Sequence, residues 1–131
     1  MIKERYCSFE VSKLLKEKGF VIPCDWIYCS DGTFGHKNSL WDKEMFLAPT
    51  HQMACDWLRE KGFYIEIQTI FDEFEPSLLK FTNFHAVITT IIDGRVIDET
   101  HLADEGIRDY GECVENAMDY CLTELMKGGE K

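Results

Sequence analysis

Two copies of one short phrase stand in the chain, LKEKGFVI at residues 15–22 and LREKGFYI at residues 58–65. Each copy follows a stretch of helical apolar periodicity and ends in β-branched and aromatic residues. Glycine readily takes the left-handed backbone angles that end a helix, and a lysine before it is favourable at the negative end of the helix dipole. The phrase therefore predicts a helix, a glycine stop and a strand, used twice. The match is short and its flanks differ, which favours convergence on a good junction over duplicated domains.

Outward from the two glycines, the sequence predicts two amphipathic helices. Residues 9–18 form the first, with Ser8 suited to cap it and Val11 and Leu15 on its inner face. Residues 50–61 form the second, with Thr50 as its cap. A third helix is expected over residues 112–126, where apolar residues recur at helical spacing.

Strand patterns occupy the middle of the chain. The apolar period changes to two over residues 63–68, as a half-solvated antiparallel strand requires. Residues 84–92 and 95–99 flank Asp93-Gly94, the dipeptide best suited to a type I′ hairpin turn. Polar segments around residues 72–76 and 100–109 are predicted to be linkers. The sequence thus predicts an α+β fold, a small antiparallel sheet of three to four strands with about three helices packed on it.

The domain organisation follows from length and composition. With 131 residues, 45% of them apolar and 13% aromatic, the chain suffices for one hydrophobic core, so we expect a single domain over residues 1–131. Residues 23–48 are predicted to be an irregular, aromatic-rich segment with a short strand at residues 26–29. Residues 127–131 are predicted to be a disordered tail.

The charge is unevenly distributed. The formal net charge is -10, and residues 71–131 carry five Lys and Arg against fourteen Asp and Glu, whereas residues 1–70 carry nine against ten. An acidic surface repels phosphates, so neither nucleic acid nor a membrane is expected as a partner. The charged start of the chain lacks a secretion signal's apolar core, which predicts a cytoplasmic protein whose six cysteines are free thiols.

Candidate chemical sites are few. Cys24 and Cys29 could join His36 and His51 around zinc or in thiol catalysis, but a second matched ligand pair and a defined base are missing from the pattern. No Gly-rich phosphate loop accompanies Asp98 and Glu99 at the end of the strand predicted at 95–99, which excludes a nucleotide hydrolase. The best metal candidates are Asp98, Glu99 and His101, with Asp104 and Glu105 beside them. A solvated polar loop explains these residues equally, so no metal or cofactor is predicted.

Two groups of residues are candidates for binding. Aromatic residues in the irregular segment could line a groove or form a satellite core, and His36 is a polar anchor beside them. Carboxylates on the outer face of the last helix could meet a basic surface. The first group is Trp26, Tyr28, Phe34, His36 and Trp41, and the second is Glu112, Glu115 and Asp119.

Several segments, taken in order, carry a resemblance: SFEV at 8–11, LLKEKGF at 14–20, Pro23-Cys24, APT at 48–50, WLRE at 57–60 and YGE at 110–112. Together they resemble a family of small proteins from bacteriophages and mobile elements of gut anaerobes. Members usually have another residue pair at Lys61-Gly62. The family has no established activity. The resemblance therefore implies a phage or prophage origin and the cytoplasm of a bacterial host, and it transfers no catalytic residue.

Two functions remain open. The first is a non-enzymatic interaction module whose acidic second half meets a host protein with a basic surface. The second is a small ligand-binding domain or enzyme that uses the aromatic segment 26–46 as a pocket wall. The edge of the hairpin around Asp93-Gly94 also offers a route to a homodimer.

Overall fold

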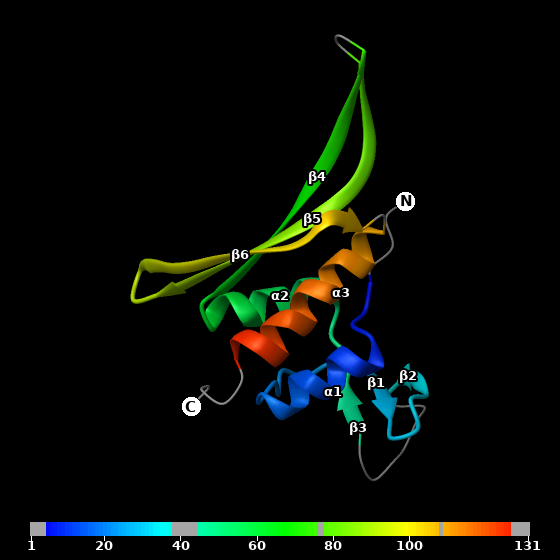
Figure 1. The fold of residues 1–131 in the computed structure, drawn as a ribbon. Helices are drawn as coiled ribbons and strands as arrows, with labels where there is room; N and C mark the ends of the chain where they lie inside the picture. The colour runs from blue at the N-terminus through cyan, green and yellow to red at the C-terminus, as the bar shows by residue number, and fades with distance from the viewer. Residues whose placement is uncertain (1–4, 38–44, 76–77, 108, 127–131) are drawn as a thin grey trace. The chain divides into compact units, whose positions relative to one another are not determined.

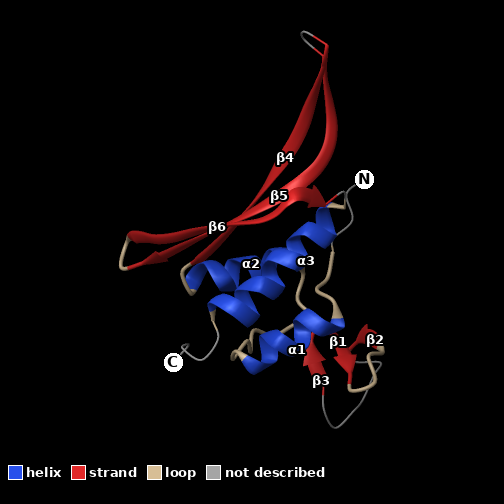
Figure 2. Cartoon of the chain, viewed as in Figure 1, coloured by secondary structure: helices blue, strands red, loops and turns tan. Residues whose placement is uncertain are grey.

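The structure, a computed structural model, describes residues 5–37, 45–75, 78–107 and 109–126. Figure 1 traces the chain and Figure 2 separates its helices from its strands. The elements are α1 (Phe9–Glu17), β1 (Trp26–Cys29), β2 (Phe34–His36), β3 (Met45–Leu47), α2 (His51–Glu60), β4 (Phe63–Glu75), β5 (Leu78–Ile92), β6 (Arg95–Ile107), α3 (Tyr110–Tyr120) and a π-helical turn, η1 (Cys121–Leu125). The predicted α+β class with three helices is confirmed, and the strands form two three-stranded antiparallel sheets where one sheet was expected.

The Cα trace forms two compact units. The first comprises Met1–Trp57 and Asp119–Lys131, and the second comprises Leu58–Met118. The expectation of a single domain stays a prediction, and the expected tail at 127–131 lies outside the described residues. Among the described residues, no helix is long and apolar enough to cross a membrane.

In the first unit, α1 forms as its sequence predicts. The Ser8 hydroxyl accepts a hydrogen bond from the Val11 backbone N–H at 3.2 Å, which satisfies one of the donors left open at a helix start. Val11 and Leu15 are buried on the inner face. Gly19 follows the helix at φ +96°, the left-handed conformation expected of the repeated phrase.

The aromatic-rich segment is more regular than predicted. The strand at 26–29 is confirmed as β1, and β1 pairs with β2 on one side and with β3 on the other. A turn at Asp31-Gly32 joins β1 to β2, with Gly32 at φ +91° and its N–H bonded to the Cys29 carbonyl at 2.9 Å. Strands of three residues, as β2 and β3 are, span too little of the chain to show an alternating pattern, so periodicity could not predict them.

The C-terminal part of the first unit ends in a wider helical turn. After α3 the chain continues through η1, which the Met126 N–H closes by bonding to the Cys121 carbonyl at 2.9 Å. The Lys18 ammonium donates to the Met126 carbonyl at 3.2 Å. This cation satisfies a backbone oxygen that the end of a helix leaves open.

In the second unit, β4, β5 and β6 lie side by side with β5 in the middle (Figure 1). The half-solvated alternation predicted for 63–68 is confirmed, because Phe63, Ile65 and Ile67 are half-buried while Tyr64 and Glu66 are exposed. The linkers predicted at 72–76 and 100–109 are wrong where the residues are described: β4 extends to Glu75 and β6 to Ile107. The backbones of these two segments pair with β5. This pairing stabilises a strand where the polar composition alone predicts a loop.

The hairpin between β5 and β6 is confirmed. Asp93 at φ +53° and Gly94 at φ +77° form its turn, as a type I′ geometry requires. The core of this unit includes the centre of β5 and the inner face of α3. Its most buried side chains include those of Leu58, Ala86, Ile88, Cys113, Ala117 and Met118.

Candidate functional site

The first candidate is an aromatic face on the small sheet of the first unit. Trp26 pairs with His36 and Tyr28 with Phe34 across β1 and β2, which places all four rings on one face because side chains two apart in a strand point the same way. The structure thus brings together four of the five residues predicted from the aromatic segment. The fifth, Trp41, lies outside the described residues.

Ring contacts hold this aromatic face together. The Trp26 and Phe34 rings are stacked, with centroids 5.3 Å apart and planes 8° apart. His36 meets Trp26 edge-on at 5.3 Å, and Tyr28 lies 5.1 Å from Phe34. Tyr6, which the sequence did not single out, joins the group at 5.6 Å from Phe34. Such pairs stabilise one another by about 0.5–1.5 kcal/mol beyond area burial.

The aromatic face is partly a core and partly a surface. The Tyr28 hydroxyl donates to the Cys7 carbonyl at 2.7 Å, which ties that ring to the chain beneath it. Phe34 is 41% exposed, so one ring of the stack meets solvent. A pocket of about 240 Å³ lies beside the stack, and Tyr6, Cys24 and Trp26 are among its lining residues.

The cysteine that lines this pocket, Cys24, is unsuited to thiolate chemistry. The Cys24 thiol is buried and donates to the Ile22 carbonyl at 3.3 Å. Burial raises the pKa of Cys24, and the neighbouring Asp25 raises it further, against a smaller opposing effect of Lys37. Nucleophiles and metal ligands need the thiolate, so this environment disfavours both roles. All six cysteines are free, as predicted.

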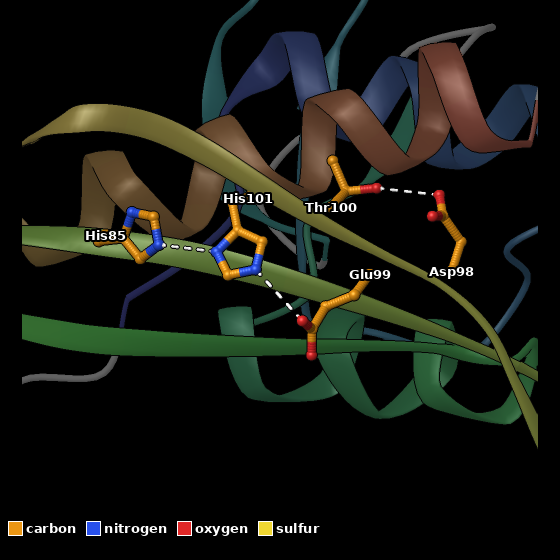
Figure 3. Close-up of polar contacts among 5 residues, drawn as sticks. All are labelled: His85, Asp98, Glu99, Thr100 and His101. Carbon is orange, nitrogen blue, oxygen red and sulfur yellow. Dashed lines mark hydrogen bonds and ion pairs between the residues drawn. The ribbon is translucent and has the colours of Figure 1, made fainter.

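The second candidate is a row of hydrogen-bonded side chains, Glu99, His101 and His85, on the sheet of β4, β5 and β6, drawn in Figure 3. His101 Nε2 lies 3.2 Å from Glu99 Oε1, and His101 Nδ1 lies 3.3 Å from His85 Nε2. Asp98 instead accepts from the Thr100 hydroxyl at 3.4 Å. Neighbouring residues of a strand point to opposite faces, so Asp98 does not join Glu99 and His101 around one point. The three predicted metal ligands therefore do not converge.

The carboxylate of Glu99 sets the direction of the hydrogen bond that it shares with His101. A carboxylate only accepts hydrogen bonds, so His101 donates to Glu99 through Nε2, and in the neutral ring Nδ1 is then an acceptor. With His101 in that neutral form, His85 donates to it through Nε2. Both nitrogens of His101 are engaged in this way, which orients the two rings and leaves no nitrogen of His101 directed at a shared ion. His85 was not predicted as part of this site. The last strand of the sheet was predicted to end at residue 99, and a strand of that length does not bring His101 beside His85.

The third candidate is the acidic face of α3. Glu112 and Asp119 are exposed, and Glu115 is half-buried. Residues three and four apart share one face of a helix, so the three carboxylates follow one line along α3. Glu112 is in the first turn, where a negative charge is favourable.

The fourth candidate is the apolar end of the β5–β6 hairpin, which the sequence did not single out. Ile92 is 54% exposed, Val96 65% and Ile97 58%. Thr90 pairs with Asp98 while Ile91 pairs with Val96, so Ile97 is the extra residue of a β-bulge. In the register predictable from Asp93-Gly94, Val96 pairs with Ile91 and so faces away from Ile92, and the sequence does not reveal that Ile92, Val96 and Ile97 remain uncovered.

Comparison of the chain with family models, with curated proteins and with solved structures found no match.

Proposed function

We propose that the protein is a non-enzymatic binding module whose second unit pairs with an extended, basic segment of a partner protein along the outer edge of β6. The observation that carries the proposal is the exposure of three apolar side chains at the hairpin end of β5 and β6: Ile92, Val96 and Ile97 are each more than half exposed, and the last two belong to the edge strand β6. The resemblance to phage and mobile-element proteins supports a partner from the bacterial host.

The backbone of β6 supplies the first support. Within the described residues, β6 is hydrogen-bonded to β5 along one side only. An edge strand presents a row of backbone N–H and C=O groups that a further strand can pair with. In such pairing the main chain supplies affinity, and alternate side chains supply specificity.

The negative charge of the second unit favours a partner that is positively charged. Residues 58–118 carry five Lys and Arg against thirteen Asp and Glu. On β6 itself, Asp98 and Glu99 are exposed directly after the apolar pair Val96 and Ile97. A partner strand that alternates apolar and basic residues would cover the first and neutralise the second, whereas an acidic strand would be repelled.

The experiment is a titration of the isotopically labelled full chain with two peptides, acetyl-KVKVKVKV-amide and acetyl-EVEVEVEV-amide, followed by amide chemical shifts. We expect the basic peptide to shift residues 95–101 saturably, and the acidic peptide to leave them unchanged. Because the attraction is between exposed charges, affinity should fall about tenfold between roughly 50 mM and 300 mM salt.

A matched pair of variants tests the surface. Val96→Thr with Ile97→Thr removes apolar contact without changing charge and should weaken binding of the basic peptide about tenfold. Val21→Thr with Ile22→Thr makes the same two changes at residues of the first unit that are 78% and 38% exposed, and should leave binding unaltered. Equal binding of both peptides would contradict the proposal. A dimer that the Val96 and Ile97 substitutions dissociate would replace the basic partner with a second copy of the chain.

A further inference from the structure

We propose that the first unit binds a small aliphatic carboxylate in a pocket between α1 and β3. The pocket has a volume of about 390 Å³. Small-ligand sites in proteins range from roughly 300 to 1,000 Å³. Its lining residues are Ser12, Lys16, Phe20, Val21, Met45 and Leu47.

A buried hydroxyl without a partner belongs to one of the residues that line this pocket. Ser12 is 1% exposed, and within the described residues its Oγ has no hydrogen-bond partner. A buried polar group left unpaired is costly, and such groups are rare in folded proteins. Because the Oγ is closed to solvent in this structure, a ligand oxygen accepts from it, and removes that cost, only when the neighbouring side chains shift.

A positive charge lies one helical turn away. Lys16 follows Ser12 by four residues on α1, so the two side chains share one face of the helix. The Lys16 ammonium donates to the Met45 carbonyl at 3.3 Å and lies 4.7 Å from the centre of the Phe46 ring. These contacts hold the charge beside the pocket. A carboxylate has two oxygens, which suits one hydroxyl donor and one ammonium donor on the same face of a helix.

The remaining wall is apolar and partly uncovered. Phe20 is buried, whereas Val21 is 78% exposed and Met45 is 39% exposed. An aliphatic tail beyond the carboxylate would cover Val21, Met45 and Leu47, and burial of apolar surface favours binding. The pocket therefore combines a site for a negatively charged headgroup with an apolar wall for the tail. This combination excludes a strongly polar or cationic ligand.

The test uses three probes with one tail: octanoate, octylamine and 1-octanol. Each is titrated into the labelled full chain, and amide shifts are followed. We expect octanoate to saturate shifts at residues 12–22 and 45–47, with octylamine at least tenfold weaker and octanol in between. Octylamine binding as tightly as octanoate, or octanoate failing to saturate these shifts, would overturn the proposal.

Two substitutions on one helix separate the pocket from the general charge of α1. Lys16→Met should weaken octanoate at least tenfold, whereas Lys13→Met, which removes the same charge outside the lining of the pocket, should not change it. Ser12→Ala should weaken octanoate several-fold. Equal effects of the two lysine substitutions would overturn the proposal. The Val96→Thr, Ile97→Thr variant should bind octanoate like the unaltered chain, so this test succeeds or fails independently of the β6 edge.

Discussion

Two serines, the cap of α1 and a residue within it, differ in their hydrogen bonds. Ser8 lies at the start of α1 and accepts from the Val11 N–H, while Ser12, one turn later, is buried with its hydroxyl unpaired. The first contact stabilises the helix because it satisfies a donor that has no partner within the helix. The second hydroxyl loses water on folding and gains nothing in the described structure. The same side chain therefore has opposite effects on stability at the two positions.

Alanine substitutions at the two positions should consequently change stability in opposite directions. Ser12→Ala removes the unpaired hydroxyl and supplies a better helix former, and should raise the free energy of unfolding by about 1–2 kcal/mol. Ser8→Ala removes the cap and should lower it by about 1 kcal/mol. Urea unfolding followed by circular dichroism measures both. Destabilisation by Ser12→Ala would show that this hydroxyl has a structural partner.

The pKa of the Cys121 thiol is strongly raised. It is fully buried, and burial, with a smaller effect from Cys55, raises its pKa from 9.0 to about 12. The folded protein therefore keeps the proton between pH 9 and 12, where the unfolded chain loses it. Stability linked to this thiol is fully present below pH 9 and is lost as the pH rises toward the folded pKa.

The free energy of unfolding should therefore fall between pH 8 and 10 partly through Cys121. The contribution approaches about 1 kcal/mol per pH unit above pH 9. Urea unfolding in a reducing buffer at several pH values, for the unaltered chain and for Cys121→Ala, isolates it, since lysines and tyrosines titrate alike in both. We expect Cys121→Ala to be less stable at pH 7.5 because of the space it leaves, but to lose less stability with rising pH. Parallel pH profiles would show that this thiol does not contribute.

At the scale of elements, the repeated phrase forms the same junction twice with different surroundings. Gly19 and Gly62 both follow a helix at positive φ, +96° and +101°. A Cβ on Gly19 would meet no heavy atom within 4 Å, whereas a Cβ on Gly62 would lie 2.6 Å from the Ile91 carbonyl oxygen. The Gly62 carbonyl also accepts from the Ile91 N–H at 2.8 Å. The second junction is thus tied to β5 as well as to its own helix.

Alanine at these two glycines should separate backbone conformation from close packing. Gly19→Ala imposes only the left-handed conformation on a residue with a Cβ, and should cost about 1–2 kcal/mol. Gly62→Ala adds a backbone clash and should cost about 3 kcal/mol or more. The two urea midpoints give the comparison. Equal losses would mean that β5 moves aside without cost, and would contradict the close approach described here.

The same elements show which structural features a sequence can predict. The three helices, the caps Ser8 and Thr50 and the turn at Asp93-Gly94 follow from local rules, and all are present. The ends of β4 and β6 do not, because their pairing with β5 is a long-range interaction that composition does not encode. The candidate sites follow the same division. The aromatic residues could be identified from their types, but the face that they share depends on β2, which periodicity does not predict. The separation of Asp98 from Glu99 follows from the alternation of the strand predicted at 95–99, whereas the place of His101 depends on residues 100–107, which were predicted as a polar segment.

At the scale of the whole molecule, charge is the dominant feature. The net charge is -10, and residues 58–118 hold most of the excess, with five basic and thirteen acidic side chains. Charges of one sign within a compact unit repel one another, which lowers the stability of the folded chain relative to the expanded one. Dissolved salt screens this repulsion over distances near 10 Å at roughly 0.1 M.

The free energy of unfolding should therefore increase with salt, by about 1 kcal/mol between roughly 20 mM and 300 mM sodium chloride. A graded series at two exposed residues, Glu60 and Glu66, tests the cause. Changing both to Gln lowers the magnitude of the net charge by two, and changing both to Lys lowers it by four. Because each step removes repulsion within the second unit, the increase with salt should be largest for the unaltered chain, smaller for the Gln variant and smallest for the Lys variant. Urea midpoints at matched salt concentrations give the three slopes. Identical dependence of the urea midpoint on salt in the three proteins would mean that salt acts by ion exclusion from the surface and not by screening the acidic unit. It would also count against a basic partner for this unit.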